Sequence, residues 1–141
     1  MKGSMKFSKR MTPKLTVDAV IQESGNVYLI RRKFRPFAGF YALPGGFVDY
    51  GETVESAVVR EAFEETGLKV KIVRLLGVYS DPKRDPRGHT ASVVFLCKPA
   101  GGSLVTSTNE TKDVRSFAKS DLKKIKLAFD HGKILKDAGL L

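Results

Sequence analysis

The segment REAFEETGL, from Arg60 to Leu68, places the strongest constraint on how this chain can fold, because it completes an amphipathic helical pattern. Thr53 is a residue type that caps helix N-termini, and Gly67 is one that ends helices in a left-handed conformation. The sequence therefore predicts a helix over Thr53–Thr66. The apolar residues that recur at helical spacing within it are Val54, Ala57, Val58 and Ala62.

Glu61, Glu64 and Glu65 crowd the C-terminal half of this predicted helix. On a helical wheel, Glu61 and Glu65 fall inside the apolar stripe and Glu64 lies at its edge. Like charges at this spacing repel by roughly 0.2–0.5 kcal/mol per pair, and a carboxylate on a packing face needs a neutralising partner. Arg60 is expected off to the side, where it cannot neutralise all three. Clustered carboxylates suit Mg²⁺ or Mn²⁺, which predicts a metal site; a solvated acidic face is the alternative.

The loop before the helix extends this pattern. Its sequence, ALPGGFVDYGE, contains a proline and two adjacent glycines, which exclude regular structure and let a backbone carbonyl approach a ligand. Gly46 is followed after five residues by Glu52, and after seven more by Arg60–Leu68. This string over residues 46–68 resembles the Nudix box of the Nudix hydrolase family at every fixed position.

The resemblance implies an α/β (α+β) domain with the Nudix fold, a mixed β-sheet sandwiched between helices. It also implies Mg²⁺- or Mn²⁺-dependent hydrolysis of a nucleoside diphosphate linked to another moiety. By position in the box, Glu61, Glu64 and Glu65 are implied to be metal ligands and catalytic residues. The carbonyl of Gly45 would add a further ligand, while Glu52 would pair with Arg60 as structural support. The implied ions would lie between these carboxylates and an anionic diphosphate, polarising the phosphoryl group.

The rest of the chain alternates strands, turns and helices without repeats or an internal linker, which favours a single domain over residues 14–141 after a flexible tail over residues 1–13. We expect a β-hairpin first, then two long strands around the turn-rich segment DPKRDPRGH, a further strand, and a closing helix. The corresponding ranges are 14–21 and 27–32, 69–80 and 90–98, 113–118, and 129–141.

Three stretches outside the helix, FYALPGGFVDYGE, YSDPKRDPRGHTASVVF and AFDHGKIL, resemble the ADP-ribose pyrophosphatase branch of the family. The implied reaction splits ADP-ribose into AMP and ribose 5-phosphate. One alternative is hydrolysis of another nucleoside diphosphate derivative or of an oxidised nucleoside triphosphate. An alternative of another class is a regulator that binds ADP-ribose without turnover.

Arg32 and Arg87 are the expected substrate-binding residues. Arg32 follows the second predicted strand, where related enzymes place a phosphate-binding arginine; a surface cation is the alternative reading. Arg84 and Arg87 share a turn-rich loop that can fold over a diphosphate, and Arg87 is favoured. The general base varies in this family. Besides the box glutamates, Glu110 in the polar segment TSTNETKD is the best candidate, against the alternative of an ordinary exposed acid.

Other candidate residues carry weaker signals. His89 and His131 are interpreted as structural residues. The aromatic residues near the expected cleft, among which the sequence does not select an adenine-stacking ring, are Phe34, Phe37, Phe40 and Tyr41. Cys97, the single cysteine, excludes an intrachain disulfide and is expected to be a buried small hydrophobe.

Charge and composition limit the classes of binding partner that we expect. The 141 residues carry a formal net charge of +10, which attracts phosphates but also fits a lysine-rich solvated surface. RNA binding is suggested by charge alone, and no stacking-aromatic motif of the common RNA modules is evident. We therefore expect a cytoplasmic protein with a nucleotide-derived small-molecule substrate and without membrane or nucleic-acid partners. The family resemblance adds a homodimer as the expected assembly.

Overall fold

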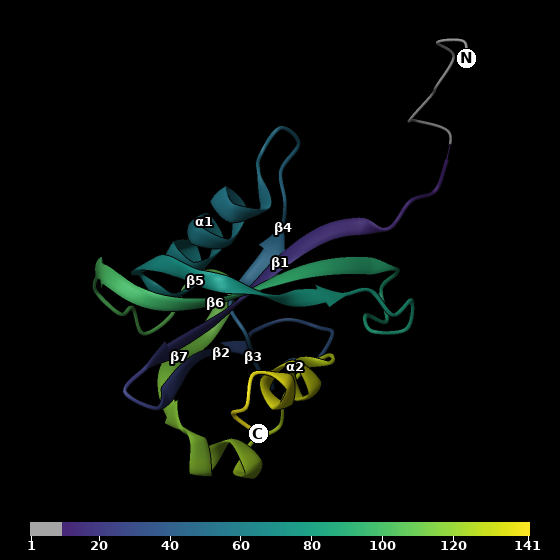
Figure 1. The fold of residues 1–141 in the computed structure, drawn as a ribbon. Helices are drawn as coiled ribbons and strands as arrows, with labels where there is room; N and C mark the ends of the chain where they lie inside the picture. The colour runs from purple at the N-terminus through teal and green to yellow at the C-terminus, as the bar shows by residue number, and fades with distance from the viewer. Residues whose placement is uncertain (1–9) are drawn as a thin grey trace.

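The computed structural model describes residues 10–141, so residues 1–9 of the predicted tail lie outside the described residues. A mixed seven-stranded sheet lies between helices, which confirms the predicted fold class (Figure 1). The strands are β1 (Lys14–Glu23), β2 (Asn26–Arg32), β3 (Tyr41–Ala42), β4 (Gly45–Phe47), β5 (Leu68–Tyr79), β6 (Thr90–Gly102) and β7 (Thr111–Ala118). The helices are α1 (Val54–Thr66), the 3₁₀ helix η1 (Lys119–Lys124) and α2 (His131–Asp137).

Strand β1 organises the sheet. It runs parallel to β6, from Lys14 opposite Thr90 to Ile21 opposite Cys97, whereas the pairings of β1 with β2 and β4 are antiparallel. The predicted hairpin between β1 and β2 is present but joins them at only two residue pairs, next to a turn in which Ser24 and Gly25 both have positive φ. The two strands then part, so that β4 can pair with the first half of β1.

The two faces of β1 bury different helices, because successive strand residues point to opposite sides of a sheet. Val17, Ala19 and Ile21 pack in one core cluster with the apolar stripe of α1. Val20 packs in a second cluster with Ile134 and other residues of the α2 side. Figure 1 shows α1 and α2 on opposite sides of the sheet. Side chains of β1 therefore reach both layers, and Asp18, in the central part of this strand, is buried.

Helix α1 has the predicted ends. The Thr53 hydroxyl accepts a hydrogen bond from the Ser56 N–H at 3.0 Å, and Gly67, with φ of 79°, closes the helix through its N–H to the Phe63 carbonyl at 2.8 Å. A Cβ on Gly67 would lie 2.2 Å from the Ser103 carbonyl oxygen, so glycine is needed here for space as well as conformation.

The closing helix is shorter than the predicted range 129–141, and that expectation is corrected. Phe129 has a φ of 52° and the Asp130 carboxylate is bound by Arg84, so α2 begins only at His131. Gly139, with φ of 80°, ends the turn that follows the helix. The sequence analysis also missed η1. Within residues 10–141, no helix is long and apolar enough to cross a bilayer.

Candidate active site

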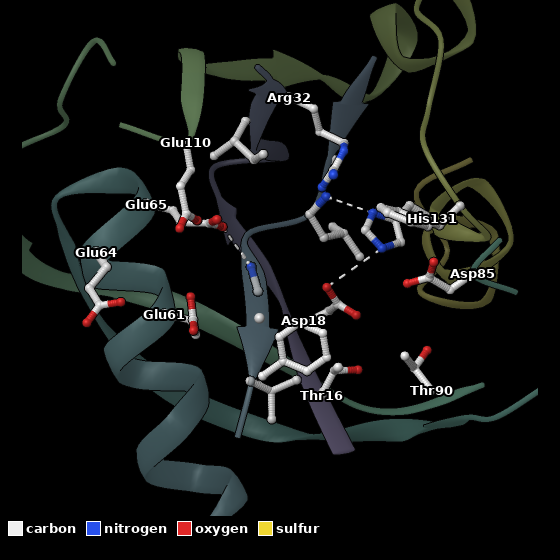
Figure 2. Close-up of a pocket in the computed structure, with 18 of the residues that line it drawn as sticks. Thr16, Asp18, Arg32, Glu61, Glu64, Glu65, Asp85, Thr90, Glu110 and His131 are labelled. Atoms are coloured by element: carbon white, nitrogen blue, oxygen red, sulfur yellow. Dashed lines mark hydrogen bonds and ion pairs between the residues drawn. The ribbon is translucent and has the colours of Figure 1, made fainter. Parts of the chain in front are cut away.

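A cavity of about 670 Å³ opens where β1, β2, β4 and α1 meet the loops before β6, β7 and α2. Figure 2 shows the glutamates of α1 on one side of this cavity and His131 and Asp85 on the other. The predicted site residues that line it come from several elements. They are Gly45, Glu61, Glu64, Glu65, Arg32, Arg87 and Glu110.

The three glutamates in the C-terminal half of α1, Glu61, Glu64 and Glu65, differ in burial as the helical wheel predicts. Glu65 is 8% exposed, Glu61 is partly buried and Glu64 is exposed. The Oε1 atom of Glu65 accepts a hydrogen bond from the Gly45 N–H at 2.9 Å. Burial raises the pKa of Glu65 to about 8, and nearby carboxylates, among them Glu61 and Glu110, push it in the same direction. These three carboxyl groups form an acidic wall of the cavity, in which Glu65 has no salt-bridge partner within the described residues.

Arg60 fastens α1 to the loop before it. Its Nε and Nη2 atoms donate to the two carboxylate oxygens of Glu52 at 2.7 and 2.9 Å, and Nη2 also reaches the Phe47 carbonyl at 3.1 Å. The expectation that Arg60 lies off to the side is wrong in one respect. Its Nη1 donates to Glu61 at 3.0 Å and to Glu64 at 3.2 Å, although it forms no salt bridge with Glu65.

Gly45 and Gly46 lie in strand β4, which pairs with β1, so the expectation that this segment excludes regular structure is wrong. Both glycines are required by close approach. A Cβ on Gly46 would lie 2.4 Å from the Glu61 Oε2 atom, and a Cβ on Gly45 would lie 2.2 Å from the Val17 carbonyl oxygen. Any side chain here would displace either the α1 carboxylate or the β1 backbone. The glycines thus let strand β4 lie directly between α1 and β1.

Glu110 enters the cavity from the loop between β6 and β7. Its charge contributes to the raised pKa of both Glu61 and Glu65, so the three carboxylates lie within electrostatic reach of one another. Figure 2 shows Glu110 extending toward the Glu65 side of the cavity. Lys33 holds the loop in place, since its N–H donates to the Glu110 carbonyl at 3.2 Å and its Nζ to the Thr108 carbonyl at 3.0 Å.

A cationic wall is built around Phe129. The guanidinium of Arg32 lies 4.9 Å from the centre of that ring, and the guanidinium of Arg87 lies 5.6 Å from it. Asp85 holds Arg87 through contacts of 2.8 and 3.1 Å, whereas Arg32 forms no salt bridge within the described part of the chain. Burial, followed by the charge of Arg87, lowers the pKa of Arg32. Within the described residues, Arg32 is therefore the member of this pair that has no salt-bridge partner.

Arg84 has a different environment from Arg87. It is buried, and its guanidinium binds both oxygens of Asp130 at 2.7 and 2.9 Å and the Thr90 hydroxyl at 2.7 Å. These bonds tie the loop before β6 to the start of α2. Because its donors are engaged inside the protein, Arg84 is a structural residue, and Arg87 remains available to the cavity.

A buried polar contact between two residues that line the cavity was missed by the sequence analysis. Asp18 of β1 accepts a hydrogen bond from the Ser92 hydroxyl at 2.5 Å, and burial raises the pKa of Asp18 to about 7. His131 accepts the Leu43 N–H on Nδ1 at 3.0 Å, which places its proton on Nε2, 3.6 Å from the Asp18 carboxylate. Burial lowers the pKa of His131 to about 3, so the ring is neutral. The sequence signal that could have revealed this contact is Asp18 itself, an acidic residue within the apolar run of β1.

The remaining candidates are His89, Cys97 and the four aromatic residues, of which only Phe34 lines the cavity. His89 Nε2 contacts the Ser80 carbonyl at 2.9 Å and closes the loop between β5 and β6. Cys97 is 2% exposed, which confirms its predicted burial. Of the four aromatic candidates, Phe37, Phe40 and Tyr41 pack against other rings, while Phe34 remains exposed.

The donor set of the acidic wall fits a divalent cation. Its carboxylate oxygens are the hard ligands that Mg²⁺ and Mn²⁺ prefer, and the charge of buried Glu65 has no cationic side chain in a salt bridge within residues 10–141. The side chains are not gathered around one point: in the described residues no three acidic, histidine or cysteine groups form such a cluster. Instead, the carboxylates of Glu61 and Glu64 accept hydrogen bonds from Arg60, and the carboxylate of Glu65 accepts one from the Gly45 N–H.

Comparison with known proteins gives a consistent result. The chain is 51% identical over 132 residues to the ADP-ribose pyrophosphatase of Methanocaldococcus jannaschii, covering 94% of this chain and 76% of that protein. Its fold matches the NUDIX domain of Shewanella oneidensis NrtR complexed with ADP ribose, with a TM-score of 0.83, 27% identity, and coverage of 96% and 92% of the two chains. It also matches a bifunctional NMN adenylyltransferase/ADP ribose pyrophosphatase from Francisella tularensis complexed with AMP and a manganese ion, with a TM-score of 0.81, 28% identity, and coverage of 92% and 42%.

The family assignment rests on more than the box. The family model for the NUDIX domain matches residues 12–138, a range that includes all seven described strands and extends through α2. The resemblance predicted from residues 46–68 is thereby confirmed over nearly the full chain. The acidic wall on α1, the glycine loop beside it and the sheet that carries both are those of a protein that belongs to the NUDIX family.

Proposed function

We propose that this protein is a divalent-cation-dependent hydrolase that splits the diphosphate of ADP-ribose into AMP and ribose 5-phosphate. The observation that carries the proposal is the shared cavity, in which the glutamates of α1 lie together with the Arg32–Arg87 pair. The high identity to an ADP-ribose pyrophosphatase supports this substrate over other nucleotides.

Glu61, Glu64 and Glu65 are the proposed ligands for Mg²⁺ or Mn²⁺, with the Gly45 carbonyl as a further ligand. When bound, such ions polarise the phosphoryl group and lower the pKa of a coordinated water. Glu61 and Glu64, whose carboxylates accept hydrogen bonds from Arg60 in this structure, would have to give up these bonds to hold a cation. Arg60 keeps its paired bonds to Glu52, so the loop stays attached to the helix during this exchange.

Arg32 and Arg87 are the proposed substrate-binding residues. A diphosphate carries oxygens on both sides of its bridge, and a guanidinium presents paired N–H groups that match them. Arg32 is partly desolvated, lies near another cation and forms no salt bridge within residues 10–141, so an anion relieves its electrostatic strain. These two arginines orient the substrate while the acidic wall holds the reacting end.

Glu110 is the proposed general base outside the box. Its carboxylate is directed toward the Glu65 side of the cavity from a loop that Lys33 holds by two hydrogen bonds (Figure 2). In this role it accepts the proton of the attacking water. The glutamates of α1 are the alternative bases. A large loss of kcat in Glu110→Gln would support Glu110 as the base, and a small loss would support the glutamates of α1.

The proposal includes an organisation and a setting for the protein. Residues 14–141 form one catalytic domain after a tail of residues 1–13, which is supported by the start of β1 at Lys14. The protein works in the cytoplasm on a nucleotide-derived small molecule, without membrane or nucleic-acid partners, and assembles as a homodimer. Sedimentation velocity measures the assembly, and a single species at the mass of one chain would contradict the dimer.

The test is a turnover assay with Mg²⁺ on ADP-ribose, NADH, diadenosine polyphosphates and 8-oxo-dGTP, with products separated by chromatography. We expect AMP to form fastest from ADP-ribose and to disappear when EDTA is added. If release of pyrophosphate from 8-oxo-dGTP is the dominant reaction, the assignment of ADP-ribose as the substrate is wrong, whereas the proposed metal site stands. Binding of ADP-ribose without turnover of any compound would instead support the regulator.

A further inference from the structure

We propose that Phe34 is the surface on which the nucleobase of the substrate stacks, so that it determines selectivity for the nucleotide half of the substrate. The inference rests on the proposed function, because it assigns the base position within the same cavity. Phe34 is exposed and belongs to none of the hydrophobic core clusters.

The structure separates Phe34 from the other aromatic candidates. Phe37 packs edge-on against Phe40, with ring centres 5.5 Å apart, and against Phe129 at 4.9 Å. Tyr41 packs against Phe117 at 4.8 Å. Phe34, in contrast, is 59% exposed and lines the cavity. Its ring is therefore free to contact a ligand, whereas the other three rings hold the fold together.

Phe34 is exposed although the backbone around it is fixed. On one side, Lys33 donates its N–H to the Glu110 carbonyl at 3.2 Å and its Nζ to the Thr108 carbonyl at 3.0 Å. On the other side, the Pro36 carbonyl accepts the Arg32 Nε at 2.7 Å. An aromatic ring on an anchored loop loses little conformational freedom when a flat partner binds. The loop thus presents a preorganised apolar face to the cavity.

The position of Phe34 suits a nucleotide. It lies two residues after Arg32, the proposed phosphate-binding cation, and both residues line the same cavity. A nucleotide combines an anionic phosphate with a flat aromatic base, which matches an arginine followed by an open phenyl ring. Stacking on the face of a ring tolerates different bases, so this contact selects for a nucleobase and leaves its identity to edge contacts.

Two other exposed aromatic residues allow the assignment to be tested. Phe47 also lines the cavity, but the Lys14 Nζ lies 5.6 Å from its ring centre and the residue sits in β4 beside the acidic wall. Tyr50 is fully exposed and is not among the residues that line the cavity. Phe47 is therefore the competing platform, and Tyr50 is the matched control.

The experiment measures AMP and ribose 5-phosphate binding by calorimetry with Mg²⁺ present, together with ADP-ribose turnover. In Phe34→Leu we expect the Kd of AMP and the KM of ADP-ribose to rise about 5- to 100-fold, as expected for loss of one stacked base, with kcat within about twofold. Phe34→Trp should restore AMP affinity. Ribose 5-phosphate affinity should stay unchanged, and Tyr50→Leu should match the wild type throughout.

The results separate this inference from the proposed function. If wild-type protein hydrolyses ADP-ribose but Phe34→Leu binds AMP normally, the stacking role is overturned and the activity stands. If Phe34→Leu loses AMP affinity while another nucleotide proves to be the substrate, the stacking role stands and the substrate assignment falls. Equal losses for AMP and ribose 5-phosphate, or a loss of AMP affinity confined to Phe47→Leu, would also overturn it.

Discussion

At the scale of single residues, burial distinguishes glutamates that share one helix. Glu65 and Glu55 are both on α1, but Glu65 is buried at the cavity while Glu55 is exposed in the first turn. A carboxylate held in a desolvated site is costly without a cation, so such a residue is retained for chemistry rather than for stability. Substitutions that keep the shape of the side chain test this distinction.

Glu65→Gln and Glu64→Gln are each expected to lower metal-dependent kcat on the order of 100-fold or more while the fold is kept, because an amide oxygen is a weaker cation ligand. Glu55→Gln on the same helix should leave kcat unchanged. Steady-state kinetics across a Mg²⁺ titration measures both effects, with circular dichroism as the check on folding. Unchanged turnover in both cavity variants would contradict a metal site on α1.

His131 gives stability a pH dependence of predictable sign. Its pKa is about 3 in the folded protein and near 6.5 when unfolded, so the unfolded chain binds more protons in this window and stability falls as pH drops. This residue alone should remove about 1.4 kcal/mol between pH 7.5 and 5.5. His131→Asn, which retains an acceptor for the Leu43 N–H, should lose that part of the pH dependence in urea unfolding. Identical pH dependence in both proteins would contradict a neutral buried ring.

At the scale of elements, the end of α1 is determined by conformation and by space together. Gly67 and Gly51 both have positive φ, 79° and 86°, but only at Gly67 would a Cβ meet other atoms. The Ser103 carbonyl and Val105 occupy that space from the segment after β6. Helix α1 is thereby held against the far end of the β5–β6 pair.

Gly51→Ala is expected to cost about 1–2 kcal/mol, the penalty of a left-handed conformation with a Cβ. Gly67→Ala should cost clearly more, because the methyl group also displaces the Ser103 backbone. Chemical denaturation of the two variants under the same conditions isolates the steric part. Equal losses of stability would show that the contact between α1 and the segment after β6 relaxes freely.

At the scale of the whole molecule, two arginines in the loop between β5 and β6 make different contacts. Arg84, 5% exposed, joins the loop before β6 to α2 through Asp130, while Arg87, 51% exposed, remains at the cavity with Asp85. The loop is thus anchored by one arginine so that the other is positioned. The net charge of +10 is compatible with a cavity that has one strongly acidic wall, since charge is distributed unevenly over the molecule.

Arg84→Gln is expected to lower the free energy of unfolding by about 3–5 kcal/mol, because it leaves the Asp130 and Asp18 carboxylates without their buried cation. Arg87→Gln should change stability by less than about 1 kcal/mol, as for other exposed ion pairs, while raising the KM of ADP-ribose. Urea unfolding and steady-state kinetics on the two variants provide the comparison. A stable Arg84→Gln protein with a raised KM would reverse the two roles.

Sequence alone determined the helix of the box, its ends and the burial order of its glutamates. These features depend on helical periodicity, on capping residue types and on fixed spacing, all of which act between residues close in the chain. It also identified the strands that form most of the sheet, although it placed the closing helix too early and too long. The helix begins later because Phe129 has a positive φ and Asp130 is bound by Arg84, a residue distant in the sequence that no local pattern identifies.

Only the tertiary structure decided which distant residues meet at the cavity. Leu43 and His131 are separated by 88 positions yet share a hydrogen bond, and Asp18 lies beside His131 because β1 runs through the middle of the sheet. The sequence already favoured Arg87 over Arg84, but the engagement of Arg84 by Asp130, and the exposure of Phe34 beside packed aromatic neighbours, depend on which side chains find partners in the fold. Such partners are set by strand pairing and packing across the whole chain, and residue type alone does not encode them.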